Sequence, residues 1–168
     1  MKTKGSVRWL CEMAMIAALY CVLTVVLSFM SFGPIQCRVS EGLCVLPYFT
    51  SASVPGLFIG CLLANAFGTP IGILDIVLGS AATLASALVA SKIKIRWLVP
   101  LPSVLFNAFL VPVVLMSAGL AEQGYFITML TVGAGQALAC YGVGMPLMLV
   151  FEKYKHKLFC EQRLGAGK

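Results

Sequence analysis

Two acidic residues and one arginine occur where the sequence is otherwise strongly apolar. Arg38 and Glu41 come just before the hydrophobic stretch 42–49, and Asp75 lies near the start of another such stretch. Charged side chains are costly in apolar surroundings and are retained there mostly for function. Carboxylates accept hydrogen bonds from a ligand, whereas an arginine donates them in a planar fork. The pattern predicts a site that binds a small polar molecule.

Amide side chains extend this set of candidate binding residues. Asn107 lies near the middle of an apolar run, and Gln136 lies about ten residues into another. Because an amide both donates and accepts hydrogen bonds, it suits a ligand that carries both kinds of group. The side chains expected to contact substrate are Glu41, Asp75, Asn107, Gln136, Arg38 and Gln36.

These residues also have a purely structural interpretation. Glu41 can pair with Arg38 at the rim of the protein or favour the positive end of its helix, and Asp75 can open a helix at the membrane surface. Asn107 and Gln136 can form hydrogen bonds between neighbouring helices. For Arg38 we expect the structural role, as the counter-ion of Glu41.

Catalytic signatures are missing from the chain. It contains no G-x-S-x-G, H-E-x-x-H or Walker A motif, and its G-A-G-K at 165–168 lacks the first glycine and the Ser/Thr of a Walker A sequence. The seven cysteines are scattered without a C-x-x-C pair, and His156 is the single histidine, so we expect no metal site and no cofactor. The sequence predicts that the protein is not an enzyme and that any ATP hydrolysis takes place in a separate chain.

The elements that must position these side chains are membrane helices. Of the 168 residues, 60% are hydrophobic and 11% are charged, and the mean hydropathy is +0.98. A soluble domain of this size cannot bury so much apolar surface. The net charge of +6 comes from short basic clusters that flank apolar segments, without the interleaved aromatics of a nucleic-acid-binding surface. We therefore predict a multi-pass protein of the plasma membrane that contacts lipid and binds no nucleic acid.

Charge and parity set the expected number of membrane spans. The basic residues at 2, 4 and 8 place the start of the chain in the cytoplasm, and those at 92, 94 and 96 place that loop there too. Only an even number of crossings joins two cytoplasmic points, so Ser40–Gly68 must contribute two, with a break near Thr50–Pro55. Two more spans return the chain to the cytoplasm, so both termini are cytoplasmic. We predict one all-α membrane domain over 1–168, with spans at about 9–30, 40–50, 54–68, 72–91, 98–118 and 126–154.

The second and third spans are unusually short. Such segments are tolerated in a membrane where they line a cavity, so they indicate where a binding site lies. On this topology Glu41 and Asp75 lie at the outer face, Asn65 ends the third span there, and Gln136 is roughly 15 Å down from the outer end of the last span. We therefore expect a pocket that opens to the outside.

The first span carries a different pattern. Ala14 and Ala18 form a small-x-x-x-small pair of the kind that lets two helices approach closely. Ala81 and Ala85 repeat the pattern in another span, so the pair alone is a weak indication of a partner.

Segments from most of the chain share a pattern with one known family. The most specific is S-F-G-P-I-Q-C-R-V-S-E at 31–41. The others are I-A-A-L-Y (16–20), L-P-Y-F-T (46–50), P-G-L-F-I-G-C-L-L-A-N (55–65), G-I-L-D-I-V-L-G-S (72–80), P-L-P-S-V-L-F-N-A (100–108) and G-Q-A-L-A-C-Y (135–141). Over about residues 8–154 the chain resembles the QueT family, the substrate-capture (S) components of energy-coupling factor (ECF) transporters that import queuosine precursors. Its main departure is cysteine at positions 37 and 44, where other apolar residues are expected.

This resemblance implies a six-helix S-component fold and a set of partners. These are a membrane scaffold subunit, which the Ala14/Ala18 pair would contact, and two cytoplasmic ATPases. It also implies a 7-deazaguanine ligand, such as queuine or a pre-queuosine base.

The candidate side chains are compatible with such a ligand. The adjacent N–H donors of the base match a carboxylate that accepts two hydrogen bonds. A precursor with an aminomethyl group is cationic and would favour a second acid. We expect Glu41 to take the donor edge or the amine and Asp75 the other, with Asn107 and Gln136 at the carbonyl and ring nitrogen.

Other functions stay open on the sequence. An S component for another vitamin or nucleobase would use the same kinds of residue, and competition binding would separate the two. A small secondary carrier or channel without partners needs a titratable carboxylate at mid-membrane, and the expected rim positions of Glu41 and Asp75 disfavour it. A membrane enzyme is least favoured, because no nucleophile–base pair or metal set is present.

Overall fold

The part of the chain described by the computed structural model, residues 6–28, 38–68, 72–120 and 124–159, is helical and contains no strand. The α-helices are α1 (Val7–Val26), α3 (Ser53–Gly68), α4 (Ile73–Ala90), α5 (Leu101–Ser117), α6 (Tyr125–Ala137) and α7 (Gly144–Leu158). Two 3₁₀ segments, η1 (Val39–Tyr48) and η2 (Arg96–Leu98), and a π-helical segment, η3 (Leu138–Val143), complete it. The prediction of an all-α chain is confirmed for this part.

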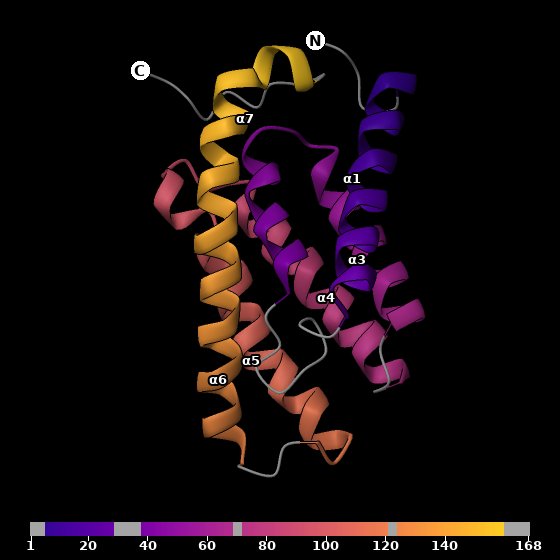
Figure 1. The fold of residues 1–168 in the computed structure, drawn as a ribbon, viewed down its shortest axis with the longest axis vertical. Helices are drawn as coiled ribbons and strands as arrows, with labels where there is room; N and C mark the ends of the chain where they lie inside the picture. The colour runs from indigo at the N-terminus through magenta and orange to yellow at the C-terminus, as the bar shows by residue number, and fades with distance from the viewer. Residues whose placement is uncertain (1–5, 29–37, 69–71, 121–123, 160–168) are drawn as a thin grey trace.

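Four helical stretches are long and apolar enough to cross a membrane. They are Val7–Val26, Ile73–Ala90, Arg96–Ser117 and Tyr125–Tyr154. The 16 residues of α3 and the 10 residues of η1 form two shorter segments that run through the same bundle. The start of α1 and the end of α7 lie at the same end of the molecule (Figure 1). That all six segments cross the membrane, with cytoplasmic termini, stays a prediction.

The break inside Ser40–Gly68 falls where its sequence predicts. The backbone N–H of Ala52 donates to Thr50 Oγ1 at 3.3 Å, and Ser53 Oγ donates to the Thr50 carbonyl at 2.7 Å. Pro55 lies in the first turn of α3, where a backbone N–H has no partner within the helix to lose. Small polar residues and a proline thus end η1 and start α3.

The last span is one continuous helical column that changes its winding in the middle. Figure 1 shows α6 and α7 in line, and η3 joins them over Leu138–Val143. A π-helical turn inserts an extra residue into an α-helix and often marks a functional position. Here η3 packs against η1, so the irregular part of the long helix faces the centre of the protein.

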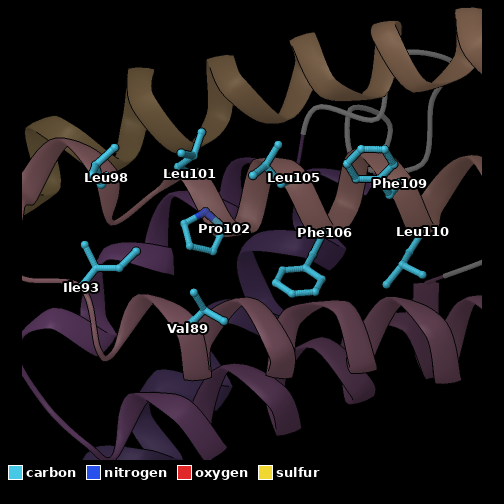
Figure 2. A pocket seen from close by; sticks show the side chains of 9 residues that line it. All are labelled: Val89, Ile93, Leu98, Leu101, Pro102, Leu105, Phe106, Phe109 and Leu110. Atoms are coloured by element: carbon cyan, nitrogen blue, oxygen red, sulfur yellow. The ribbon is translucent and has the colours of Figure 1, made fainter.

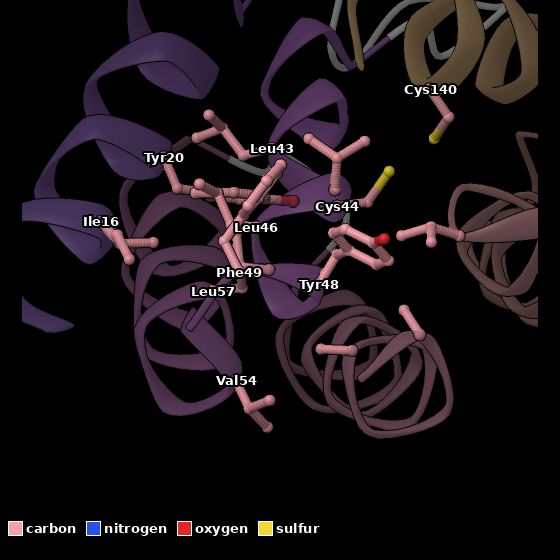
Figure 3. Close-up of a cluster of buried hydrophobic side chains, with 14 of the residues drawn as sticks. Ile16, Tyr20, Leu43, Cys44, Leu46, Tyr48, Phe49, Val54, Leu57 and Cys140 are labelled. Atoms are coloured by element: carbon pink, nitrogen blue, oxygen red, sulfur yellow. The ribbon is translucent and has the colours of Figure 1, made fainter. Parts of the chain in front are cut away.

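The short helix η1 forms the centre of the bundle. The helices α1, α3, α4, α5 and α6 pack in chain order, and η1 contacts α1, α3, α4, η3 and α7. All residues from Ser40 to Tyr48 are buried. Figure 3 shows side chains of α1, η1 and α3 gathered in one cluster, with Cys140 of η3 at its edge. The site candidates near η1 are therefore held in the core of the fold.

The helices α1 and α3 approach so closely that a side chain at Gly60 has no space. A Cβ added there would lie 2.8 Å from the Ala17 carbonyl oxygen and 2.8 Å from Tyr20 Cβ. The contact uses Ala17, which is buried, and leaves Ala14 and Ala18 exposed on α1. Ala14 and Ala18 are therefore not covered by another helix within the described part of the bundle.

Large apolar side chains are exposed on the surface of the bundle, and charged side chains are buried inside it. Phe67, Ile73 and Phe126 are 78, 75 and 74% exposed, whereas Arg38, Glu41 and Asp75 are at most 2% exposed. Soluble proteins rarely expose such extensive apolar surface. The distribution fits a multi-pass membrane protein whose outside contacts lipid.

Candidate functional site

Three buried charged side chains lie inside the bundle at two levels. Asp75 and Thr83, which mark the two levels on α4, are eight residues apart, or roughly 12 Å along the helix. Arg38 and Asp75 form the outer level, and Glu41 lies at the inner level beside Thr83.

The outer level is built on an ion pair. Arg38 donates from its guanidinium to Asp75 Oδ2 at 3.5 Å, and both side chains are almost fully buried. Arg38 was expected to pair with Glu41, and that prediction is wrong. Arg38 precedes η1 in an extended conformation and its side chain meets α4, whereas Glu41 lies within η1.

Asn65 joins α3 to this level. Its amide donates to the backbone carbonyl of Asp75 at 3.2 Å, and the residue is fully buried three positions before the end of α3. Gly79 makes room for the contact, because a Cβ there would lie 2.8 Å from Asn65 Nδ2 and 3.4 Å from Asp75 Oδ1. Asn65 was expected to end its helix; it instead connects two helices beside the ion pair.

Two buried oxygens of the outer level, Asn65 Oδ1 and Asp75 Oδ1, have no hydrogen-bond partner among the described residues. Ser80 Oγ is also unpartnered there, and it lies nearer Thr83 than Asp75 along α4. An unpartnered buried polar group is costly and rare in folded proteins. The two free acceptors are suited to a ligand with hydrogen-bond donors.

At the inner level, hydroxyl groups from three helices surround Glu41. Tyr20 Oη of α1 donates to Glu41 Oε1 at 2.5 Å, and Ser103 Oγ of α5 donates to Oε2 at 2.5 Å. Thr83 Oγ1 of α4 lies 3.5 Å from Oε1. A carboxylate has about four acceptor positions, so these contacts leave room for one more donor at Oε2.

The position of Glu41 differs from the expected one at the outer rim. It contacts the middle of α4 through Thr83 and the first turn of α5, at the opposite end of the bundle, through Ser103. The rim position was inferred from where the apolar stretch begins. In the fold, Arg38 already lies between the helices before η1 starts, so Glu41 is one 3₁₀ turn deeper, about 6 Å.

The remaining candidates belong to the same polar network. Asn107 Nδ2 donates to Ser103 Oγ at 3.4 Å. Asn107 therefore contacts the serine that donates to Glu41. Gln136 is 1% exposed and accepts from Cys140 Sγ at 3.9 Å, and Cys140 also lies 3.6 Å from the Glu41 carbonyl oxygen. Gln36 falls outside the described residues.

Cys61 connects the two levels. Thr83 Oγ1 lies 3.3 Å from its sulfur, and Asn65 Nδ2 lies 3.6 Å from it. Tyr20, Thr83, Ser103 and Cys61 were not predicted from the sequence. Hydroxyl and thiol groups are common in membrane helices, so their presence alone did not distinguish them.

The charges of the network do not cancel. Arg38 compensates Asp75, and Glu41 is surrounded by neutral hydroxyl donors in the described part of the chain. With all three groups ionised, the interior carries one net negative charge, which is costly in a medium of low dielectric constant. The site is therefore suited to a cationic ligand, or to a neutral one that presents several N–H donors.

Comparisons with known proteins identify a family. The family described as QueT transporter matches residues 10–153. A queuosine precursor transporter QueT of Lactococcus lactis subsp. cremoris (strain MG1363) is 38% identical over 73 residues. The matched region is 42% of this chain and 42% of that protein, so the chain spans less than half of that relative in the comparison. No solved structure gives a significant match.

Proposed function

Because the chain belongs to the QueT transporter family, we propose that it captures a queuosine precursor for uptake as the S component of an ATP-driven ECF transporter. The observation that carries the proposal is the carboxylate of Glu41, buried between α1, α4 and α5. It accepts hydrogen bonds from Tyr20 and Ser103 and lies 3.5 Å from the Thr83 hydroxyl. A single relative named for queuosine precursors supports the ligand class.

A 7-deazaguanine ligand matches the acceptors of the network. Glu41 takes the pairing edge, where the acceptor position left at Oε2 receives one of its N–H donors, or it takes an aminomethyl group, and Asp75 receives the other. The free oxygens of Asn65 and Asp75 add acceptors at the outer level. Asn107 and Gln136 contact the carbonyl and the ring nitrogen. The net negative charge of the network favours a precursor that carries the amine.

The exposed surface of α1 supports contact with a membrane scaffold subunit. Ala14 and Ala18 lie on its outer face, where a second helix can approach closely. The scaffold membrane subunit contacts this face, and two cytoplasmic ATPases supply the energy. The chain lies in the plasma membrane with six spans and both termini in the cytoplasm.

Binding calorimetry on the detergent-purified chain tests the role of Glu41. Queuine and the pre-queuosine base are titrated, with guanine and riboflavin as controls for an S component of another ligand class. Glu41→Gln should weaken binding more than tenfold, or about 1.4 kcal/mol, because the amide presents a donor where the carboxylate accepts. Glu152→Gln is the matched control, since it removes a partly exposed carboxylate far along α7. Unchanged binding by Glu41→Gln would remove this residue from the site.

One observation favours a second candidate function. Glu41 lies deep in the bundle, where a partner-independent secondary carrier would place the carboxylate that couples transport to an ion. Uptake by proteoliposomes that contain this chain alone distinguishes the two. Uptake without ATPases supports the secondary carrier, whereas binding without uptake supports the S component.

A further inference from the structure

A groove on the outside of the bundle runs between α4 and α5. It has a volume of about 670 Å³ and is lined by Val89, Ile93, Leu98, Leu101, Pro102, Leu105, Phe106, Phe109 and Leu110. Figure 2 shows Val89 and Ile93 of the α4 side facing the side chains of α5. Val89, Leu105 and Phe109 are 42, 47 and 54% exposed, so the groove is open to the surroundings of the bundle. It is separate from the polar network around Glu41.

The length of the groove matches one half of a bilayer. On α5 its lining extends from Leu101 to Leu110, nine residues apart, or roughly 14 Å along the helix. One leaflet contributes about half of the ~30 Å hydrocarbon core. A single acyl chain lying along α5 would therefore fill the groove from the membrane surface to the midplane.

The surface end of the groove carries positive charge. Lys92 and Lys94 flank the lining residue Ile93, both are exposed, and neither forms an ion pair within the described part of the chain. Arg96 is already paired with Glu152 at 2.8 Å. Trp97 is 68% exposed at the same end, which is typical of indole rings at the level of lipid headgroups.

We propose that this groove binds an acyl chain of an anionic phospholipid, whose phosphate headgroup is held by Lys92 and Lys94. The apolar lining accepts the chain of any phospholipid. Discrimination comes from the two lysines, each of which gains roughly fivefold in affinity near an anionic headgroup. The proposal does not depend on which substrate the protein carries.

Quenching of Trp97 fluorescence by brominated lipids tests this proposal. The chain has two tryptophans, so Trp9→Phe leaves Trp97 as the only one. This variant is placed in phosphatidylcholine vesicles that contain increasing fractions of brominated phosphatidylglycerol or of brominated phosphatidylcholine with the same chains. The phosphatidylglycerol should reach half-maximal quenching at a mole fraction at least fivefold lower.

Substitutions test whether the preference for phosphatidylglycerol arises in the groove. Lys92→Gln with Lys94→Gln should abolish it, whereas Lys153→Gln, on α7 and exposed, should leave it unchanged. Val89→Phe should reduce quenching by filling the groove, and Leu130→Phe, on the exposed face of α6, should not. Equal quenching by both lipids, or a preference that survives the double substitution, overturns the proposal. Cross-linking of Leu105→Cys to a partner protein in membranes also overturns it, since the groove would then hold a protein helix.

Discussion

The ion pair between Arg38 and Asp75 allows a quantitative test of the outer level. Its atoms are 3.5 Å apart and its side chains are 2% and 0% exposed. Removing one member deprives the other buried charge of its ion-pair partner, which costs about 3–5 kcal/mol. Asp75→Asn and Arg38→Gln should each lower the free energy of unfolding by that amount. The double variant removes both charges together and should lose clearly less than the sum of the single variants.

Unfolding of the purified variants in mixed micelles, followed by circular dichroism, measures these free energies. The pair Arg96 and Glu152 is the matched control: its atoms are closer, 2.8 Å, but its side chains are 49% and 26% exposed. Solvent screening limits such a pair to less than about 1 kcal/mol. Additive losses in the double variant, or single losses no larger than those of the exposed pair, would refute the reasoning. Either result would mean that the buried pair does not stabilise the protein.

Two further predictions concern α1. Gly60→Ala should destabilise the protein by about 1–3 kcal/mol, because its Cβ would lie 2.8 Å from the Ala17 carbonyl oxygen. The control Gly142→Ala places a Cβ with nothing within 4 Å and should be nearly neutral in the same unfolding assay. Equal losses of stability in the two variants would contradict the close packing of α1 on α3. Ala14→Leu with Ala18→Leu should reduce co-purification of the scaffold subunit without changing calorimetric ligand binding, and Val25→Leu, exposed on the same helix, should do neither. A complex that survives the double substitution would place the scaffold elsewhere.

The arrangement of helices could largely be predicted from the sequence. Long apolar runs with few charged residues identify the four long helices, and the polar residues with Pro55 identify the turn before α3. These features are local, because each depends on residues close together in the chain. The topology itself still depends on the positive-inside rule, which concerns the membrane rather than the fold.

The details of the site depend on contacts between distant residues. Arg38 and Asp75 are 37 positions apart, and nothing near Arg38 in the chain indicates that its partner is on α4 rather than at Glu41. The depth of Glu41 was misplaced because the start of an apolar stretch does not reveal where the backbone enters the bundle. The acids and amides were nevertheless recognised, since their burial in an apolar chain requires a reason.

The hydroxyl groups around Glu41 were missed for a different reason. Serine and threonine in a helix can bond to a carbonyl one turn earlier, as Thr83 does to Gly79 at 3.1 Å. They therefore occur in apolar helices without needing a ligand or a charged partner. Only the fold shows that Tyr20, Thr83 and Ser103 meet at one carboxylate.

Glu41 and the hydroxyl groups around it lie on different helices, which has a consequence for how the surroundings of the carboxylate can be changed. Glu41 lies on η1, which contacts α1, α3, α4, η3 and α7. The hydroxyl groups around its carboxylate come one each from α1, α4 and α5. A single substitution at position 83 or 103 changes the hydroxyl groups around the carboxylate, whereas Tyr20 also belongs to the core cluster that contains side chains of η1. On the proposal that Glu41 binds the ligand, libraries limited to positions 20, 83 and 103 test whether these groups set the selectivity.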